Sequence, residues 1–343
     1  MGEIVATSGR PNTYLLTGEP DERQMNPTTI LRRIGYFLLA YSALAFAAGV
    51  FVAEGTLHPG RRPLTDNDQI VGRKLAQQYD SDFALASVSA ADGVPLQAWY
   101  LRPGTRNGQT VVLFHGLSDN RVGVISYARI FLEHGYDVLM PDARAHGASG
   151  GDLATYGSRE SGDIRAWLDW LEANEHPSCI YGFAESMGAA GLLQSLQSEK
   201  RFCAVVAESP FSSFREIAYD RIGRFFHAGP WLGRTILRPV VEIAFIDARW
   251  KYGLDFEQVS PERAVTSTRV PVLLIHGKAD RNIPVRHSRK IAAGNQAVVL
   301  WEVPGADHCG AQGAGPAEFE HRVIAWFEQK NRSGATNSTL SGL

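Results

Sequence analysis

The sequence predicts an α/β protein built on an eight-stranded, mostly parallel sheet with helices on both faces. Three observations support this class. Short, continuously apolar runs, typical of strands buried on both faces, recur from residue 83 to residue 302. Longer stretches of helical character separate most of these runs. The composition, with 44% hydrophobic and 20% charged residues, is ordinary for a globular domain with a large core.

The expected strands follow one another from an opening hairpin, whose two runs meet at the turn Asp92-Gly93. The eight predicted strands occupy residues 83–88, 96–100, 110–114, 137–140, 179–183, 204–207, 272–275 and 297–302. Helices are predicted between strands at 160–173 and 189–198. Residues 211–268 break the alternation, because they have helical character, many aromatic side chains and no convincing strand. They are predicted to be an insertion after the sixth strand.

An apolar segment near the N-terminus, residues 34–53, predicts a transmembrane helix. It contains no charged residue, and its twenty residues at 1.5 Å each span about 30 Å, the thickness of a bilayer's hydrocarbon core. Arg32 and Arg33 precede it directly. A cleaved signal peptide, with small residues at Ala45 and Ala47, and a buried helix of a soluble protein are the alternatives. We expect an uncleaved single-pass anchor, with the globular domain on the extracytoplasmic side of the membrane.

Composition suggests the remaining boundaries and excludes several classes of protein. Residues 1–33 are expected to be a disordered polar segment, 54–80 a linker, 81–330 the globular domain and 331–343 a flexible tail. The net charge is −2 and the basic residues are scattered, which gives no indication of nucleic-acid binding. Three cysteines exclude a disulfide-rich scaffold and a cysteine-rich metal site. No metal and no organic cofactor are expected.

A serine at the end of the fifth predicted strand is the first candidate for chemistry. The segment Ala184-Glu185-Ser186-Met187-Gly188 places Ser186 where a buried strand must turn sharply into a helix. The positions two before and two after the serine hold small residues, Ala184 and Gly188, as required where strand and helix backbones pass close together. Such a turn predicts a nucleophilic serine. A helix N-cap without a catalytic role is the alternative.

An acid and a base follow the serine in chain order. Asp280 lies on the polar turn after the seventh predicted strand, and His308 lies in the loop after the eighth. A serine hydroxyl needs an imidazole to accept its proton and a carboxylate to orient that imidazole. The pattern therefore predicts that Ser186, His308 and Asp280 form a catalytic triad.

These motifs resemble the α/β-hydrolase family, and the likeness extends from about residue 82 to residue 330. His115-Gly116 closes the third predicted strand, and in the family such a turn is followed by a donor of the oxyanion hole. The resemblance implies that the backbone N–H groups of Leu117 and Met187 are the two oxyanion donors. Some members carry the acid one strand earlier, where this chain has Glu208, which is the alternative acid.

The resemblance implies a serine hydrolase of carboxylic esters, and the apolar segment 34–53 predicts that it is anchored in a membrane. Its substrate is expected to be a small-molecule or lipid ester, thioesters included, bound beneath a cap formed by residues 211–268. A serine peptidase, an acyltransferase and a non-catalytic binding protein of the same fold are the alternatives. In the family's sheet, the strands that begin at Cys179 and Cys203 are parallel neighbours. This placement implies a disulfide between them if the domain is exported.

Overall fold

The computed structural model describes residues 26–340, with side chains up to residue 329, and the chain divides after Leu44 into two units. The predicted disordered segment falls mostly outside the described residues. Its last part does not, because helix α1 (Pro27–Leu57) begins within it. The boundary predicted at residue 33 is therefore wrong.

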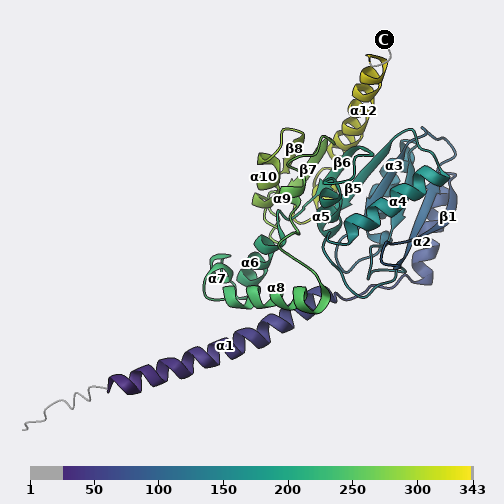
Figure 1. The fold of residues 1–343 in the computed structure, drawn as a ribbon. Coiled ribbons are helices and arrows are strands. Elements are labelled where there is room, and N and C mark those ends of the chain that lie inside the picture. Colours follow the sequence, from purple (N-terminus) through teal and green to yellow (C-terminus); the bar gives the residue numbers. More distant parts are fainter. Residues whose placement is uncertain (1–25, 341–343) are drawn as a thin grey trace, which may run out of the picture. The chain divides into compact units, whose positions relative to one another are not determined.

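An eight-stranded sheet forms the centre of the second unit (Figure 1), with the strand order β1-β2-β4-β3-β5-β6-β7-β8. β1 and β4 pair antiparallel with β2, and every other pair is parallel. The strands are β1 (Asp82–Ser89), β2 (Pro95–Arg102), β3 (Thr110–Phe114), β4 (Asp137–Pro141), β5 (Ile180–Glu185), β6 (Phe202–Glu208), β7 (Val272–Gly277) and β8 (Val298–Val303). The predicted class is confirmed, and each predicted strand end is correct to within two residues.

Helices cover both faces of this sheet, and each face has its own hydrophobic core. One core receives side chains from α2 (Asp66–Gln78), α3 (Ile125–Glu133) and α12 (Pro316–Leu340). The other receives them from α4 (Glu160–Asn174), α5 (Ser186–Ser195) and α10 (Arg286–Ala293). Successive strand residues alternate between the two cores, as Trp99 and Tyr100 of β2 do.

The predicted insertion after the sixth strand is confirmed as a group of helices between β6 and β7 (Figure 1). They are α6 (Phe214–Phe225), α7 (Trp231–Arg234), α8 (Arg238–Tyr252) and α9 (Pro261–Ala264). A third hydrophobic core lies here, in which the rings of Phe214 and Phe256 stack at 4.2 Å. Leu57 and Met187 also belong to this core, so it joins the insertion to the end of α1 and to the start of α5.

Helix α1 is longer than the predicted segment 34–53, and its last turns, which belong to the second unit, pack against α8. Its buried side chains recur at every fourth position, which places them on one face: Ala45, Gly49, Ala53 and Leu57. A Cβ atom at Gly49 would lie 2.6 Å from Cβ of Ile243 on α8, so glycine permits the close approach of the two helices. Within the described residues, one helix has the length and the apolar composition needed to cross a membrane, and that helix is α1.

The predicted linker 54–80 is wrong, because it contains the last residues of α1 and the whole of α2, which packs on the sheet. Thr65 begins α2 with a capping box, in which its side chain accepts from the N–H of Asp68 and the Asp68 carboxylate accepts from the N–H of Thr65. A Cβ atom at Gly72 would lie 2.6 Å from the Trp99 ring, and Leu75 enters the core. At the other end, α12 continues to Leu340. The tail boundary predicted at residue 331 is therefore also wrong, and residues 341–343 lie outside the described part.

The expected disulfide is present. Cys179 directly precedes β5, Cys203 is the second residue of β6, and their sulfurs are bonded with the Cα atoms 6.0 Å apart. The parallel pairing of β5 with β6 brings the two cysteines together, because Ile180 lies opposite Phe202. This confirms the pairing inferred from the resemblance.

Candidate active site

Ser186 stands on a strained turn between β5 and α5. Its φ is +51°, in the left-handed region that non-glycine residues rarely adopt. Gly188 lies so close to the end of β3 and the turn after it that a Cβ atom at this position would be 2.6 Å from the His115 carbonyl oxygen. Ala184, by contrast, is fully buried and pairs with Phe114 of β3, so the core accommodates its methyl group. The turn thus has the geometry of a nucleophile elbow, with the serine hydroxyl raised at the end of the sheet.

The structure brings Ser186, His308 and Asp280 into one hydrogen-bonded chain. His308 Nε2 lies 2.9 Å from Ser186 Oγ, and His308 Nδ1 lies 2.8 Å from Asp280 Oδ2. Because a carboxylate only accepts, Nδ1 carries the proton and Nε2 is left to accept the serine hydroxyl proton. This is the tautomer that a general base requires.

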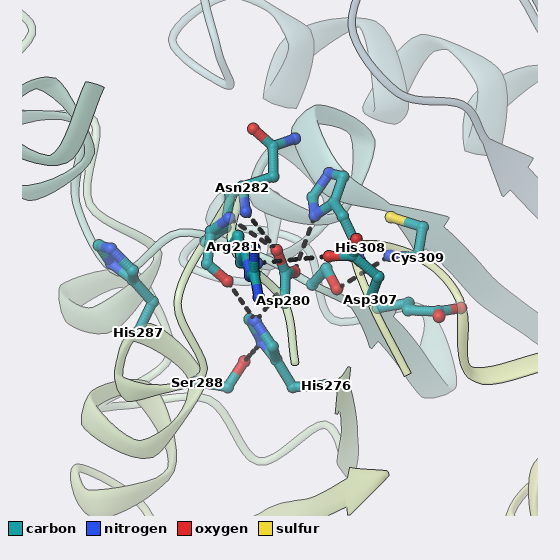
Figure 2. Close-up of polar contacts among 12 residues, drawn as sticks. His276, Asp280, Arg281, Asn282, His287, Ser288, Asp307, His308 and Cys309 are labelled. Atoms are coloured by element: carbon teal, nitrogen blue, oxygen red, sulfur yellow. Dashed lines mark hydrogen bonds and ion pairs between the residues drawn. The ribbon is translucent and has the colours of Figure 1, made fainter. Parts of the chain in front are cut away.

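Asp280 is held in place from several sides (Figure 2). Its Oδ1 accepts from the backbone N–H groups of Asn282 and Ile283, both at 2.8 Å. Burial alone would raise the pKa of Asp280, but hydrogen bonds from His276 and His308 hold it well below its ordinary value. The carboxylate therefore stays ionised and remains an acceptor for His308.

His276 is a site residue that the sequence analysis did not identify. It is the fifth residue of β7, fully buried, and its Nε2 lies 2.7 Å from the Ile283 carbonyl oxygen and 3.3 Å from Asp280 Oδ2. Both neighbours accept, so Nε2 carries the proton, and Nδ1 accepts from the Ser288 hydroxyl at 2.7 Å. His276 thus links the acid loop to α10 (Figure 2). Its place in an apolar strand run gave no sign of this contact.

Glu208, the alternative acid, is not bonded to His308. Its Oε1 accepts from the N–H of Ala311 at 3.0 Å, and its Oε2 accepts from the Tyr127 hydroxyl at 3.1 Å. Burial raises the pKa of Glu208. Its contacts fix the loop that carries His308. Burial, followed by the negative charge of Glu208, also raises the pKa of neighbouring Glu185 to about 7.

The proposed oxyanion donors, Leu117 and Met187, line the same cavity as Ser186. Met187 lies in the first turn of α5, where backbone N–H groups have no acceptor within the helix. The turn that carries Leu117 is held by two buried histidines. His115 Nε2 accepts from the N–H of Ala143 at 3.0 Å, and His146 Nε2 accepts from the N–H of Ser118 at 3.1 Å. Burial lowers the pKa of His115 to about 4, so it stays a neutral acceptor.

The cavity above Ser186 has a volume of about 380 Å³ and is mostly apolar. Its walls come from the end of α1, the turn with Leu117, Tyr156, the start of α5, the cap with helices α6 and α8, and Ile283 of the acid loop. The apolar cap residues among them are Phe211, Phe214, Ile217, Ala218, Ile222, Val241, Ala244, Phe245 and Phe256. A cavity of this size and lining is suited to an acyl chain of a small or medium-sized ester.

A second Ser-His-Asp chain lies nearby and has a different character. Ser212 Oγ lies 2.9 Å from His287 Nδ1, and His287 Nε2 lies 2.7 Å from Asp220 Oδ2. Ser212 is fully buried, and its own N–H also donates to His287 Nδ1. Because Asp220 belongs to α6 and His287 to α10, this chain fastens the cap to the sheet domain. In Figure 2, His287 lies apart from the group around Asp280.

Comparison with known sequences supports this assignment of the fold. The profile of the alpha/beta hydrolase family matches residues 111–322. The uncharacterized protein YqkD of Bacillus subtilis is 28% identical over 269 residues, which are 76% of this chain and 84% of that protein. The uncharacterized protein Rv2307c of Mycobacterium tuberculosis is 30% identical over 226 residues, which are 64% of this chain and 70% of that protein.

Solved structures give the same result. The esterase Pf2001 of Pyrococcus furiosus superposes with a TM-score of 0.59 at 25% identity, over 74% of this chain and 94% of the esterase. In another crystal form the TM-score is 0.62 at 24% identity, over 80% of this chain and 98% of that one.

Proposed function

The chain belongs to the alpha/beta hydrolase family, and from this premise we propose that it is a serine hydrolase of carboxylic esters. The observation that carries the proposal is the chain of hydrogen bonds from Ser186 Oγ through His308 to Asp280, at 2.9 and 2.8 Å. Ser186, at the start of this chain, lines a mostly apolar cavity that is suited to an acyl group. The similarity to an enzyme described as an esterase also supports this choice of substrate.

The proposed reaction proceeds in two halves. His308 Nε2 accepts the Ser186 proton while Oγ attacks the ester carbonyl, and the N–H groups of Leu117 and Met187 bind the oxygen that becomes negative. The tetrahedral intermediate then collapses, and His308 protonates the departing alcohol. Water, deprotonated by the same imidazole, then attacks the acyl-enzyme and forms a second tetrahedral intermediate. Collapse of this intermediate releases the acid, and His308 returns the proton to Ser186.

Hydrolysis of p-nitrophenyl esters of straight-chain acids tests this proposal. We expect turnover by the wild-type protein and a preference for acyl chains that fill the cavity over acetate. Ser186→Ala should abolish turnover, whereas Ser212→Ala, in the buried second chain, should retain it if the variant remains folded. Absence of ester turnover by folded wild-type protein would reject the ester assignment.

We further propose that α1 anchors the protein in a membrane, with the catalytic unit on the extracytoplasmic side. The length and hydropathy of α1 support the anchor. The disulfide between Cys179 and Cys203 supports the orientation, because disulfides persist in oxidising compartments. Membranes washed with alkaline carbonate should retain the protein, and protease added outside the cytoplasm should reach the catalytic unit. Release of the protein by carbonate would contradict the membrane anchor. Protection of the catalytic unit from that protease would contradict the extracytoplasmic orientation.

A further inference from the structure

The active-site cavity is apolar except at one charged side chain. Among the described residues that line it, Arg221 is the one with a charge. It lies on α6 between two apolar residues of the cavity wall, Ala218 and Ile222, and its side chain is exposed. In the part of the chain whose side chains are described, no hydrogen bond or ion pair involves this guanidinium group.

The acidic neighbour of Arg221 in sequence is occupied by other partners. The Asp220 carboxylate is paired with the guanidinium of Arg286 and bonded to His287 Nε2 at 2.7 Å. Burial alone would raise the pKa of Asp220, but the hydrogen bonds from His287 and Arg286 lower it below the ordinary value. The carboxylate of Asp220 is therefore paired with Arg286 and His287 and forms no ion pair with Arg221.

The other polar groups near Arg221 are also engaged. The Asp280 carboxylate is bonded to His308 and to the backbone N–H groups of Asn282 and Ile283. The Tyr156 hydroxyl, which shares the cavity wall with Arg221, donates to the Thr56 carbonyl oxygen at 2.8 Å. Among the described side chains, Arg221 thus has no bonded partner in the cavity that also contains Ser186.

A guanidinium that has no bonded or paired partner and lines a mostly apolar cavity favours the binding of an anion. The planar guanidinium matches carboxylate and phosphate groups, with which it forms paired hydrogen bonds.

We propose that Arg221 binds an anionic oxygen group, a carboxylate or a phosphate, carried by the ester substrate. The enzyme then selects amphiphilic esters that have an apolar acyl chain and one negative group over neutral esters of the same length. This inference rests on the proposed esterase function and specifies its substrate class. Arg221 is a specificity residue in it, whereas Ser186, His308 and Asp280 perform the reaction.

Two matched substrate pairs test the proposal and distinguish where the anion is carried. The first pair is p-nitrophenyl octanoate and mono-p-nitrophenyl suberate, which differ by a carboxylate at the end of the acyl chain. The second pair is lauroylglycerol and its phosphate monoester, which differ by a phosphate on the alcohol. In at least one pair we expect kcat/KM to be about tenfold or more higher for the anionic member, mainly through KM, as suits a charge-assisted hydrogen bond.

Three variants identify the residue responsible. Arg221→Gln should bring the favoured pair close to parity, because it lowers kcat/KM for the anionic ester far more than for the neutral one, and Arg221→Lys should keep part of the preference. Arg249→Gln is the matched control, because Arg249 is an exposed arginine on cap helix α8 that does not line the cavity. It should keep the full preference.

The proposal is overturned if the wild-type enzyme prefers the neutral member in both pairs or shows no preference. It is equally overturned if Arg221→Gln retains the preference or slows both members of a pair by the same factor. Wild-type protein that hydrolyses none of the four esters contradicts the proposed function instead, so the two failures are distinguishable.

Discussion

Two carboxylates lie near His308, and their hydrogen bonds give them different tasks. Asp280 accepts from the imidazole itself, whereas Glu208 accepts from the backbone of Ala311, the first residue of the short helix α11 (Ala311–Ala314) that follows the loop. The first contact determines the tautomer of the base. The second determines where the loop lies. Only the first acts, through the imidazole, on the proton that moves between Ser186 and His308 Nε2 in the proposed reaction.

This difference predicts unequal effects of removing the two charges. Asp280→Asn should lower kcat by about 10⁴-fold, because the amide no longer selects the Nδ1–H tautomer of His308. Glu208→Gln keeps an oxygen that can accept from Ala311 and should reduce kcat by about tenfold at most. Steady-state kinetics with a p-nitrophenyl ester measures both. A larger loss in Glu208→Gln than in Asp280→Asn would transfer the role of the acid to Glu208.

Glu185 predicts a pH dependence of stability. Its pKa is raised from 4.5 to about 7, first by burial and then by the charge of Glu208, so the folded protein holds this proton more tightly than the unfolded chain. The free energy of unfolding should therefore fall as the pH rises from about 4.5 through about 7. Glu185→Gln stays neutral and should remove this part of the fall.

Chemical denaturation at two pH values measures the effect. Relative to wild type, Glu185→Gln should gain on the order of 2 kcal/mol between pH 4 and pH 8, below the full value of the pKa shift because the side chain is partly exposed. Glu133→Gln, on the exposed side of α3, is the control and should show no such gain. An equal stability difference at both pH values would show that Glu185 does not titrate in this way.

At the scale of elements, the contact between α1 and α8 depends on one small residue. Gly49→Leu should destabilise the protein by about 1–3 kcal/mol, because its side chain would meet Ile243 and the Val240 carbonyl oxygen. Gly35→Leu is the matched control on the same helix, since a Cβ atom there has no neighbour within 4 Å. Thermal unfolding in detergent measures both. Equal melting temperatures for the two variants would contradict the packing of α1 on α8.

The strands were predictable from sequence because parallel strands buried on both faces read as continuous apolar runs. Ser186, Asp280 and His308 could be placed because each follows such a run, and the ends of parallel strands meet at one edge of the sheet. Helix α2 was missed for a different reason. Its mostly polar sequence has little apolar periodicity, and only the capping box at Thr65 and Asp68 indicates where it begins.

Two further features depend on contacts that a sequence does not reveal. The role of His276 arises where β7, the acid loop and α10 meet, and nothing in its strand distinguishes it from a core residue. The isolation of Arg221 depends on which partners occupy Asp220, and these partners come from a helix more than sixty residues away in the chain. Such features appear only when the packing is known.

At the scale of the whole molecule, the disulfide links the strands that flank the nucleophile's helix. Cys179 and Cys203 are 24 residues apart, so their bond restricts the unfolded chain across α5. Replacing both by serine should lower the free energy of unfolding by about 2–4 kcal/mol, measured by guanidinium denaturation under oxidising conditions. Reductant should destabilise the wild-type protein similarly and leave the double variant unchanged. A reductant-insensitive wild-type protein would contradict the bond.

The central claim, that Ser186 is an activated nucleophile, is tested most directly by a fluorophosphonate probe, which forms a covalent adduct only with such a serine. Mass spectrometry of the digested full-length protein should locate one adduct on the peptide that contains Ser186. Ser186→Ala should give no adduct, and Ser212→Ala should be labelled like the wild type. Folded wild-type protein that remains unlabelled, or an adduct on another residue, would contradict the claim.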